Sequence, residues 1–528
     1  MRNFHATGRS TAYATNAMAA TSTAESTLEA LYVLRQGGNA VDAAVTAAAV
    51  LCVAEPHMTG IGGDCFVLVG HPDGRVEGLN GSGRSSARAD AEWLATSGLA
   101  EITHDNVHAV TVPGAIDAWG KLLAKHGTID LAQALEPAIR LAERGCPVGQ
   151  RVAWDWARHT DKLARDEGAR RHYLPGGQTP QAGDIMRYPA LANTLQTIAR
   201  HGRDGFYSGE VAEDIVATLA ANGSLLTLDD FAATDATWVD PISTVYAGRE
   251  LLEIPPNGTG ITALIALNAL KAFDMTRYAP DSVERRHLEI EAIKLAWVLR
   301  NRHVADPDQA PAPIEDLLSE ATAEQLAGII DMDRAFDAPE AAVPMPRSDT
   351  VYLTVVDKDR MAVSFINSLY DEFGAGIVTP ETGIALQSRG AGFVTTPGHP
   401  NCIAPSKRPL HTIIPAMVRE NGRVSMSFGV MGGDYQPMGH TAVMLNRYVY
   451  GMDPQAAIDF PRAFPKQGIV GIEDTICDAV AEALRQRGHV VERVLKPWGG
   501  GQAIAIDHAS GLLSGGSDPR KDGLALGY

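Results

Sequence analysis

The first candidate for chemistry is a threonine hydroxyl at the point where an irregular segment of the chain meets a strand. The segment 338–348 contains three prolines, which exclude a continuous helix there. Residues 349–357 alternate apolar and polar side chains and 361–370 has a similar β-branched composition, so a β-hairpin is predicted. Thr350 therefore opens a strand directly after an exposed connector. On this pattern alone, it is most simply a β-branched strand residue.

Two glycine-rich stretches could suggest phosphate or nucleotide binding. The glycines within 60–63 precede an apolar, strand-like run, and no Lys-Ser or Lys-Thr pair follows them, so a phosphate-binding loop is not indicated. The glycines within 258–260 follow two prolines and lack the strand and acidic residue of a dinucleotide fingerprint. We interpret both stretches as turns with close packing, and we expect no cofactor.

Metal and serine-hydrolase patterns are also weak. His57 with Asp64, and His399 with Cys402, read as isolated pairs without a third ligand at a recognisable spacing. The chain contains neither a His-Glu-x-x-His motif nor a Gly-x-Ser-x-Gly motif. The sequence therefore indicates no metal site, zinc protease or serine hydrolase.

The composition is that of an ordinary globular protein, with 45% hydrophobic and 20% charged residues. A net charge of −18 without a basic run argues against nucleic acid, and an anionic substrate would need a local group of arginines. Five scattered cysteines without a Cys-x-x-Cys pair predict no disulfide framework. No apolar run is long enough to span a membrane and the first residues lack a signal-peptide core, so we expect a cytoplasmic protein.

Several short motifs are spread over nearly the whole chain. They lie at 37–44, 60–64, 350–376, 383–386, 407–410, 432–433 and 517–520. In this order they resemble the gamma-glutamyltranspeptidase family of N-terminal nucleophile hydrolases, and the part from residue 350 onward resembles its small subunit. The resemblance implies an α+β fold, a four-layer αββα sandwich with two central antiparallel sheets.

The resemblance also implies that the precursor cuts itself between Asp349 and Thr350. A large chain, 1–349, and a small chain, 350–528, would then remain together as a heterodimer in one structural body. The new α-amine of Thr350 has a reference pKa of about 8, so part of it is unprotonated at neutral pH and takes the proton from its own Oγ. One residue then supplies both nucleophile and base.

Three further residues match catalytic positions of the family. Backbone N–H groups of Gly432 and Gly433 match those that hold the tetrahedral oxyanion, where losing one donor typically costs about 100- to 1,000-fold in rate. Ser368 matches a threonine that hydrogen-bonds the hydroxyl of the nucleophile, and it keeps an O–H group. Without the resemblance, the glycine pair would be read as a plain turn.

The substrate-binding positions depart from the family pattern. An asparagine, a glutamine or glutamate and an aspartate bind the γ-glutamyl ammonium in standard members, whereas Tyr370, Arg389 and Gly392 occupy these positions here. A unit charge about 4 Å away at an effective dielectric of 20 is worth about 4 kcal/mol. Exchanging a carboxylate for a guanidinium therefore disfavours an acyl group that bears an ammonium.

The carboxylate-binding positions have changed as well. His411 and Thr412 replace two serines, and the family arginine aligns with Ser82, two residues before Arg84. Arginine suits bidentate recognition of a carboxylate. Either Arg84 reaches the site from a shifted loop or Arg389 binds the carboxylate, and both alternatives remain open.

This pattern resembles the branch of the family that includes oxamate amidohydrolase and the glutaryl-cephalosporin acylases. We hypothesise hydrolysis of a small anionic amide whose acyl group carries a carboxylate and no amine. Oxamate, giving oxalate and ammonia, is favoured over glutaryl amides because the bulky Tyr370 would fill space that a longer chain needs. The alternatives are a gamma-glutamyltransferase or glutathione hydrolase, and an uncut, inactive binding protein.

The elements that would position these residues follow from periodicity and breakers. Residues 40–53 are apolar on nearly every side, which predicts a buried helix, and 65–69 predicts a buried strand. Further helices are predicted at 115–125, 131–144, 191–201, 283–298 and 314–330. From residue 350, strands are expected to dominate until helices near 452–460 and 474–488.

Overall fold

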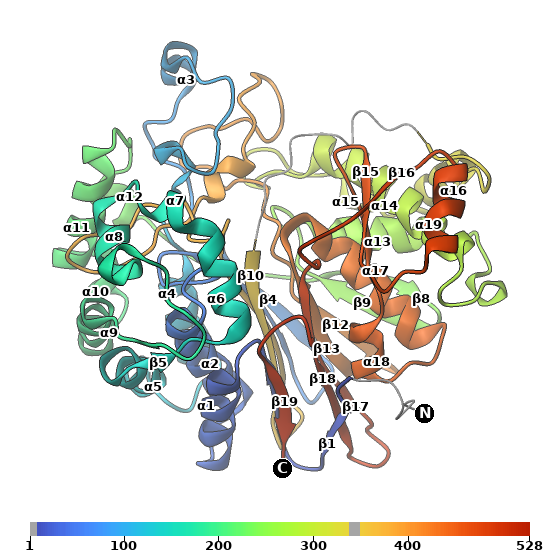
Figure 1. Ribbon diagram of the computed structural model, residues 1–528, viewed down its shortest axis with the longest axis horizontal. Coiled ribbons are helices and arrows are strands. Elements are labelled where there is room, and N and C mark those ends of the chain that lie inside the picture. Colours follow the sequence, from blue (N-terminus) through green and yellow to red (C-terminus); the bar gives the residue numbers. More distant parts are fainter. Residues whose placement is uncertain (1–7, 337–348) are drawn as a thin grey trace.

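The computed structural model describes residues 8–336 and 349–528, so the predicted connector 338–348 lies outside the described residues. Two seven-stranded antiparallel sheets stack face to face in the middle of the molecule (Figure 1). The β10 sheet has the strand order β19-β2-β10-β11-β3-β4-β7, and the β13 sheet has the order β1-β18-β17-β13-β12-β9-β8. Hydrogen bonding between neighbouring strands therefore continues across the whole width of each sheet.

The strands of the β10 sheet are β2 Met18–Thr21, β3 Asp64–Gly70, β4 Val76–Gly81, β7 Thr237–Val239, β10 Asp349–Val356, β11 Ala362–Tyr370 and β19 Leu524–Gly527. Those of the β13 sheet are β1 Ala12–Ala14, β8 Ile242–Tyr246, β9 Arg249–Glu253, β12 Ala416–Glu420, β13 Arg423–Met431, β17 Gly500–Ile506 and β18 Leu513–Ser517. Both sheets thus contain strands from before and after residue 350. A chain cut at that point would still be held together by two sheets.

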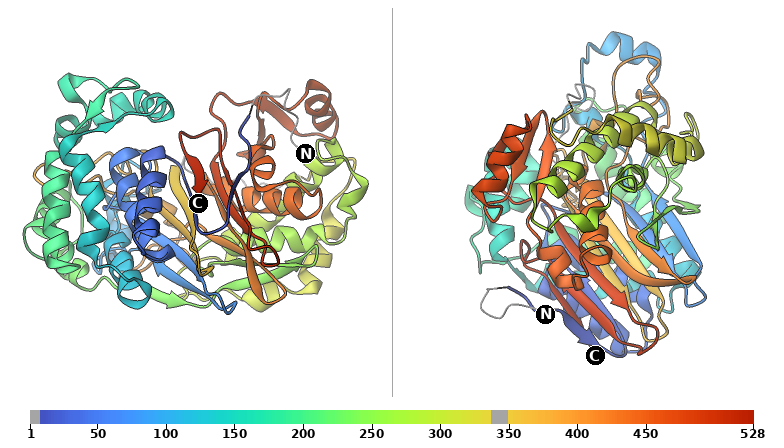
Figure 2. Two further views of the ribbon diagram at one scale, coloured as in Figure 1. Left: turned by 90° about the horizontal axis from the view of Figure 1, so that it is seen from below. Right: turned by 90° about the vertical axis from the view of Figure 1, so that its right-hand side faces the viewer.

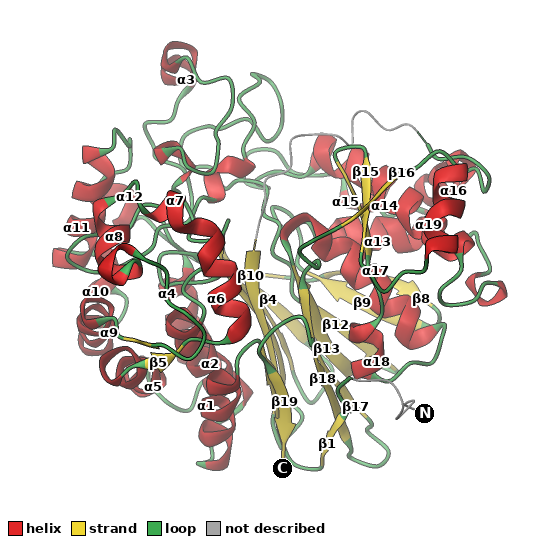
Figure 3. Cartoon of the chain, viewed as in Figure 1, coloured by secondary structure: helices red, strands yellow, loops and turns green. Residues whose placement is uncertain are grey.

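Helices cover the outer face of each sheet, which gives four layers (Figures 2 and 3). On the side of the β10 sheet lie α1 Ala24–Arg35, α2 Ala40–Ala54, α4 Ala115–His126, α5 Leu131–Arg144, α6 Gln150–Trp156, α7 Thr160–Leu163, α8 Glu167–Tyr173, α9 Pro189–His201, α10 Asp204–Tyr207, α11 Gly209–Ala221 and α12 Leu228–Ala232. On the side of the β13 sheet lie α13 Gly260–Leu270, α14 Val283–His303, α15 Ile314–Leu317, α16 Glu320–Ile329, α17 Gln436–Tyr448, α18 Pro454–Asp459 and α19 Asp478–Gln486. The predicted αββα sandwich is confirmed.

Helix α3, Ala91–Ser97, projects above the β10 side of the sandwich in Figure 1. All residues of α2 are buried, as the apolar pattern predicts, and its N-terminus is closed by a capping box between Asn39 and Asp42. Helix α2 packs against β10, so it supports the strand whose second residue is the candidate threonine.

Further along β10 from Thr350, a hydrogen bond between polar side chains and a close contact at one glycine bring the two sheets together. Thr354 Oγ1 on β10 donates to Ser427 Oγ on β13 over 2.6 Å. A Cβ atom at Gly429 would lie 2.4 Å from the ring of Tyr352, so only glycine leaves room for this buried tyrosine. These contacts fix β10 laterally against the β13 sheet.

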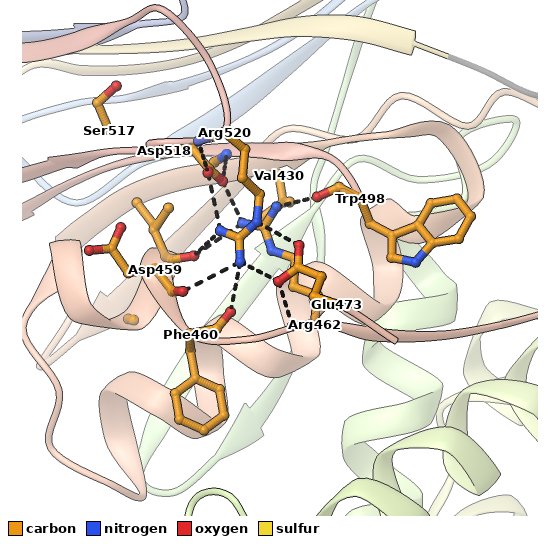
Figure 4. Close-up of polar contacts among 12 residues, drawn as sticks. Val430, Asp459, Phe460, Arg462, Glu473, Trp498, Ser517, Asp518 and Arg520 are labelled. Atoms are coloured by element: carbon orange, nitrogen blue, oxygen red, sulfur yellow. Dashed lines mark hydrogen bonds and ion pairs between the residues drawn. The ribbon is translucent and has the colours of Figure 1, made fainter. Parts of the chain in front are cut away.

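A third, three-stranded sheet lies above the β13 sheet and is formed by β14 Ala463–Lys466, β15 Ile469–Ile472 and β16 Val490–Arg493. Strands β14 and β15 are antiparallel, whereas β15 and β16 are parallel. Arg462, directly before β14, and Glu473, directly after β15, belong to a charged network in which Arg462 binds Asp518 and Arg520 binds Glu473 (Figure 4). Such linked and largely buried pairs restrain the loop that follows β16.

The periodic elements were predicted well and the irregular ones were not. The β10–β11 hairpin is confirmed, with Thr354 opposite Ser364, and helix α5 has the predicted bounds. The prediction of a single helix at 314–330 was wrong, because Ser319 caps a new helix by accepting a hydrogen bond from the N–H of Thr322. The prediction that strands continue to about residue 452 was also wrong, because α17 lies at Gln436–Tyr448.

All five cysteines are free thiols in this structure. Within 8–336 and 349–528, the helices are too short or too polar to cross a membrane.

Candidate active site

Thr350 lies buried at the start of β10, beside the end of β11. Its Oγ1 is 3.1 Å from Ser368 Oγ on β11. Asp349 pairs with Tyr370 and Val351 with Asn367, so Thr350 faces two residues of β11, Ser368 and Leu369, and β11 has a β-bulge there. Bulges are frequent beside active sites because they redirect a side chain out of the regular alternation.

Two glycines bring neighbouring segments close to Ser368. A Cβ atom at Gly63 would lie 2.3 Å from the carbonyl oxygen of Ser368, and one at Gly62 would lie 2.2 Å from that of Ala385. The prediction that these glycines serve a turn and close packing is therefore confirmed. The stretch positions the end of β11, where the candidate residues gather.

Arg389 lies in the short 3-10 helix Arg389–Gly392 and its side chain is fully buried. Its Nη2 donates to Ser368 Oγ and its Nη1 donates to Thr412 Oγ1, each over 3.0 Å. Its Cζ lies 3.9 Å from the centre of the Tyr370 ring, within cation–π range. Tyr370 has a φ of 80°, which is rare for a bulky residue and places strain at this point.

The charge of Arg389 has no matching carboxylate among the residues that the structure describes. The guanidinium makes no ion pair there, and its Nε is buried without a hydrogen-bond partner. Burial lowers the pKa of Arg389 to about 10, opposed by Tyr370, Asp64 and Asp434. The group therefore stays charged at neutral pH, and a buried cation without a counter-ion is energetically costly.

Arg84 lies apart from this cluster. Its guanidinium binds Asp306 over 3.0 Å, Asp308 over 2.6 Å and the carbonyl oxygen of Ser406 over 2.9 Å. Because two carboxylates contact the Arg84 guanidinium, its positive charge is already compensated. Of the two arginines that the sequence left open, the structure brings Arg389 to Thr350 and leaves Arg84 elsewhere.

His411 is buried beside Asp64, with 3.1 Å between Nε2 and Oδ2. Burial and then the charge of Arg389 lower the pKa of His411 to about 3, so the imidazole is neutral. The N–H of Ile413 faces Nδ1 over 3.4 Å, which assigns the ring proton to Nε2 and makes Asp64 the acceptor. Because His411 is neutral, it adds no second positive charge next to Arg389.

This arrangement predicts a loss of stability in acid. The folded pKa of His411 is about 3 and the unfolded pKa about 6.5, so its contribution is complete above pH 6.5 and is lost as the pH falls toward 3. At pH 5 the loss is about 2 kcal/mol. Denaturant unfolding at pH 7 and pH 5 should show a smaller pH effect in His411→Gln. An equal pH effect in both proteins would contradict the assignment.

Gly432 and Gly433 lie at the turn between β13 and α17, with φ angles of 123° and 57°. A Cβ atom at Gly432 would lie 2.9 Å from Gly499 Cα, so the close approach of the two loops also requires glycine. The first N–H groups of a helical segment have no partner inside it. The turn that opens Gly433–Tyr435 and α17 can therefore offer N–H groups to an anion.

Sequence reasoning did not find two polar residues near the site, His104 and Asp434. His104 Nδ1 lies 2.9 Å from Ser388 Oγ, its ring contacts Tyr370, and burial lowers its pKa to about 4. Asp434, directly after the glycine pair, accepts a hydrogen bond from Arg300 over 2.7 Å. His104 is 284 positions from its partner, so no local pattern could indicate it, whereas the place of Asp434 beside Gly433 was a usable signal.

Three groups of side chains have metal-ligand geometry within the described parts of the chain. They are His71, Glu77 and His126; His287, Glu291 and His489; and His57, Asp155 and Glu372. The sequence pattern considered His57 only together with Asp64, whereas the structure places His57 Nε2 3.6 Å from Asp155 Oδ2. In each group a glutamate already forms an ion pair with a lysine. The pairs are Glu77 with Lys125, Glu291 with Lys294, and Glu372 with Lys496. In each group an ammonium therefore already offsets part of the negative charge that would attract a metal ion.

The sequence profile of the family described as Gamma-glutamyltranspeptidase matches residues 27–528. A glutathione hydrolase-like YwrD proenzyme of Bacillus subtilis is 39% identical over 511 residues, which cover 94% of this chain and 95% of that protein. An oxamate amidohydrolase proenzyme of Klebsiella pneumoniae is 35% identical, over 94% of this chain and 96% of that protein.

Among solved structures, a cephalosporin acylase from Bacillus halodurans superposes with a TM-score of 0.93 at 40% identity. The superposition covers 100% of this chain and 98% of that chain. The likeness therefore extends over both sheets and both helical layers.

Proposed function

This chain belongs to the gamma-glutamyltranspeptidase family, and from that premise we propose a self-cleaving amidohydrolase for acyl groups that carry a carboxylate and no amine. Its family and relatives make it an N-terminal nucleophile hydrolase of amide bonds. Oxalyl, as in oxamate, and glutaryl are the two candidate acyl groups. The observation behind this proposal is the buried, unneutralised Arg389 that shares Ser368 with Thr350.

Cleavage before Thr350 would create the catalytic group. In the unbroken chain, the nitrogen of Thr350 belongs to a peptide bond and cannot act as a base. Once the bond from Asp349 is cut, the free α-amine takes the proton of the Thr350 hydroxyl while Oγ1 attacks the substrate carbonyl. Relatives named as proenzymes support such a cleavage in this chain. The two resulting chains, 1–349 and 350–528, would stay joined through both sheets.

The tetrahedral intermediate would place its oxyanion at the turn of Gly432 and Gly433. N–H groups aimed at the developing charge stabilise this species more than the substrate, which is the basis of rate acceleration. When the intermediate collapses, the amine leaves with the proton from the α-amine, and water then hydrolyses the threonyl ester. Thr350 returns to its starting form.

Arg389 would bind the carboxylate of the acyl group. Its Nη2 and Thr350 Oγ1 contact the same Ser368 oxygen, so a carboxylate on the guanidinium lies within a short chain of the attacked carbonyl. A neutral acyl group would leave the buried cation uncompensated, and an ammonium would be repelled by it. The relatives named for oxamate and cephalosporin acyl hydrolysis fit this acyl class.

Ammonia release from three primary amides tests the proposed function. The cleaved protein would receive oxamate, glutaramate or glutamine at equal concentration, with the Thr350→Ala protein as the blank. We expect oxamate or glutaramate to be hydrolysed with a kcat/KM at least about tenfold above that of glutamine, because the ammonium of glutamine faces Arg389. Preferred hydrolysis of glutamine would refute the role assigned to the arginine.

Replacing Ser368 with alanine should slow both cleavage and hydrolysis. Ser368 Oγ is shared by Thr350 Oγ1, Arg389 Nη2 and the N–H of Tyr370, so its loss leaves a buried charged donor unpaired. Hydrogen bonds to charged groups are worth about 1.5–3 kcal/mol, so kcat/KM should fall about 10- to 100-fold. Ser368→Thr keeps the hydroxyl and should retain most activity. Equal losses in the two variants, measured by steady-state kinetics, would contradict this role.

A further inference from the structure

Asp64 is a fully buried carboxylate at the start of β3, next to the candidate active site. In the strand pairing it stands directly opposite Ser368 of β11. The hydroxyl of Ser368 contacts both Thr350 and Arg389. The proposed cleavage and hydrolysis give this carboxylate no task of their own, although burying it is costly.

Four hydrogen-bond donors converge on the side chain of Asp64. Its Oδ1 accepts the N–H groups of Gly83 and Gly114 over 3.1 Å each, and Nε2 of Gln387 over 2.9 Å. Its Oδ2 accepts the Nε2–H of His411 over 3.1 Å. A carboxylate has two oxygens with about four lone-pair sites, so it can satisfy all four donors at once. One side chain therefore ties together four segments that are far apart in the sequence.

Two of these segments carry groups that bind each other at the candidate acyl site. Gln387 lies two residues before Arg389, and His411 lies directly before Thr412. Because Arg389 Nη1 donates to Thr412 Oγ1 over 3.0 Å, both ends of this hydrogen bond are anchored through Asp64. The anchor also joins the two parts of the chain, since Asp64 precedes the proposed cut and both segments follow it.

Asp64 could act on Arg389 in two physically different ways. As a nearby negative charge, it opposes the lowering of the Arg389 pKa by burial. As an anchor, it fixes the backbone from which the long arginine side chain extends, together with the hydroxyl that receives Nη1. Removing only a counter-ion would strengthen the attraction of Arg389 for a carboxylate, whereas removing an anchor would weaken its grip. The two roles therefore predict opposite effects.

Resting on the proposed hydrolysis at Thr350, we propose that Asp64 is a positioning residue that sets the acyl specificity by holding Arg389 and Thr412 in the arrangement that binds the acyl carboxylate. Asparagine cannot replace it, because the amide has one oxygen and would turn its NH₂ group toward another donor. A displacement of about 1 Å in a substrate-positioning group can cost about 100-fold in rate. The loss should fall on acyl groups that use Arg389.

The test compares anilides that differ only in the carboxylate of the acyl group. Glutaryl anilide is paired with pentanoyl anilide, and oxalyl anilide with acetyl anilide; the pair whose carboxylate-bearing member is hydrolysed faster is used. For the cleaved wild-type protein, we expect a kcat/KM ratio within this pair of at least about 100. In Asp64→Asn the ratio should fall at least about tenfold, mainly through a higher KM for the carboxylate-bearing anilide.

Gln387→Met tests the same anchor without a change of charge. Nε2 of Gln387 donates to Asp64 and, over 3.0 Å, to Thr111 Oγ1, whereas its Oε1 is buried without a partner among the described residues. Methionine has a similar volume and removes this unpaired oxygen, so the variant should fold and be cut. The ratio should fall about three- to tenfold, the effect of one or two lost hydrogen bonds.

Asp42→Asn is the matched control. Asp42 is also a fully buried carboxylate with four donors, namely the N–H groups of Asn39, Thr128 and Ile129 and the hydroxyl of Thr128. It lies at the start of α2, where the N–H of Ala40 bonds Asp357, beyond the end of β10 that is opposite to Thr350. This variant should be less stable in denaturant and should keep the ratio within about twofold.

The outcomes separate this inference from the proposed function. An unchanged ratio in Asp64→Asn would overturn the inference alone. A higher ratio would overturn it as well, because Asp64 would then be a counter-ion of Arg389 and not an anchor. If Asp64→Asn does not fold or is not cut, the ratio in Gln387→Met decides. A cleaved wild-type protein that shows no preference for the carboxylate-bearing anilides would overturn both the proposed function and the inference.

Discussion

Replacing Thr350 with alanine is expected to leave the chain uncut and to abolish amide hydrolysis. The hydroxyl is needed twice: it attacks the peptide bond during maturation and the substrate carbonyl afterwards. The neighbouring groups cannot take over, because Ser368 Oγ already serves Arg389 and the N–H of Tyr370. Removing a nucleophile of this kind typically costs about 10⁴-fold or more in kcat. Mass spectrometry under denaturing conditions should find one 56.1 kDa chain after long incubation.

Two matched variants separate this role from folding. Thr350→Ser keeps a hydroxyl and should still give the fragments 1–349 and 350–528. Thr354→Ala removes another buried threonine of β10, whose Oγ1 bonds Ser427, and should be cut normally despite lower stability. A wild-type chain that stays whole would instead support an inactive binding protein. Cleavage of Thr350→Ala at the same bond would assign the nucleophile to another residue.

Replacing Arg389 with methionine is expected to lower kcat/KM for an anionic acyl group by at least about 100-fold. The substitution removes the charge that would bind the carboxylate, and a charge about 4 Å away is worth about 4 kcal/mol at an effective dielectric of 20. Stability should not fall in parallel, because an unpaired buried cation is itself costly and methionine has a similar volume. Kinetics with a glutaryl anilide and denaturant unfolding together check both outcomes.

Arg84→Met is the matched control for this experiment. Arg84 is 29% exposed and already binds Asp306 and Asp308, so its loss should change kcat/KM by less than about twofold. The pair of variants therefore decides between the two arginines that the sequence offered. A large kinetic loss in Arg84→Met with little effect in Arg389→Met would reverse the assignment.

Local periodicity explains why much of the sandwich could be predicted. The β10–β11 hairpin and α2 have strong alternating or wholly apolar patterns, and tertiary packing agrees with them. Helix α17 was missed because Pro437 and Gly439 interrupt its first turn and read as loop residues. The buried glycine at 439 is required by packing, since a Cβ atom there would lie 2.9 Å from Val430.

The site was predictable only where family motifs marked it. The resemblance pointed to Thr350, Ser368, Arg389 and Thr412, and these residues do lie together, although their roles remain predictions. It could not indicate that Arg84 would be compensated by two aspartates, nor that His104 would reach the site. Those contacts join segments far apart in the chain and leave no local pattern.

The ratio of kcat/KM for a glutaryl and a γ-glutamyl amide of the same aniline tests the central claim most directly. The two acyl groups differ by one amine, so the ratio isolates the response of the Arg389 region to an ammonium. With a buried cation that lacks a carboxylate partner within residues 8–336 and 349–528, we predict that the cleaved protein favours the glutaryl amide by more than about tenfold. A ratio in favour of the γ-glutamyl amide would contradict the account and indicate a glutathione-type hydrolase.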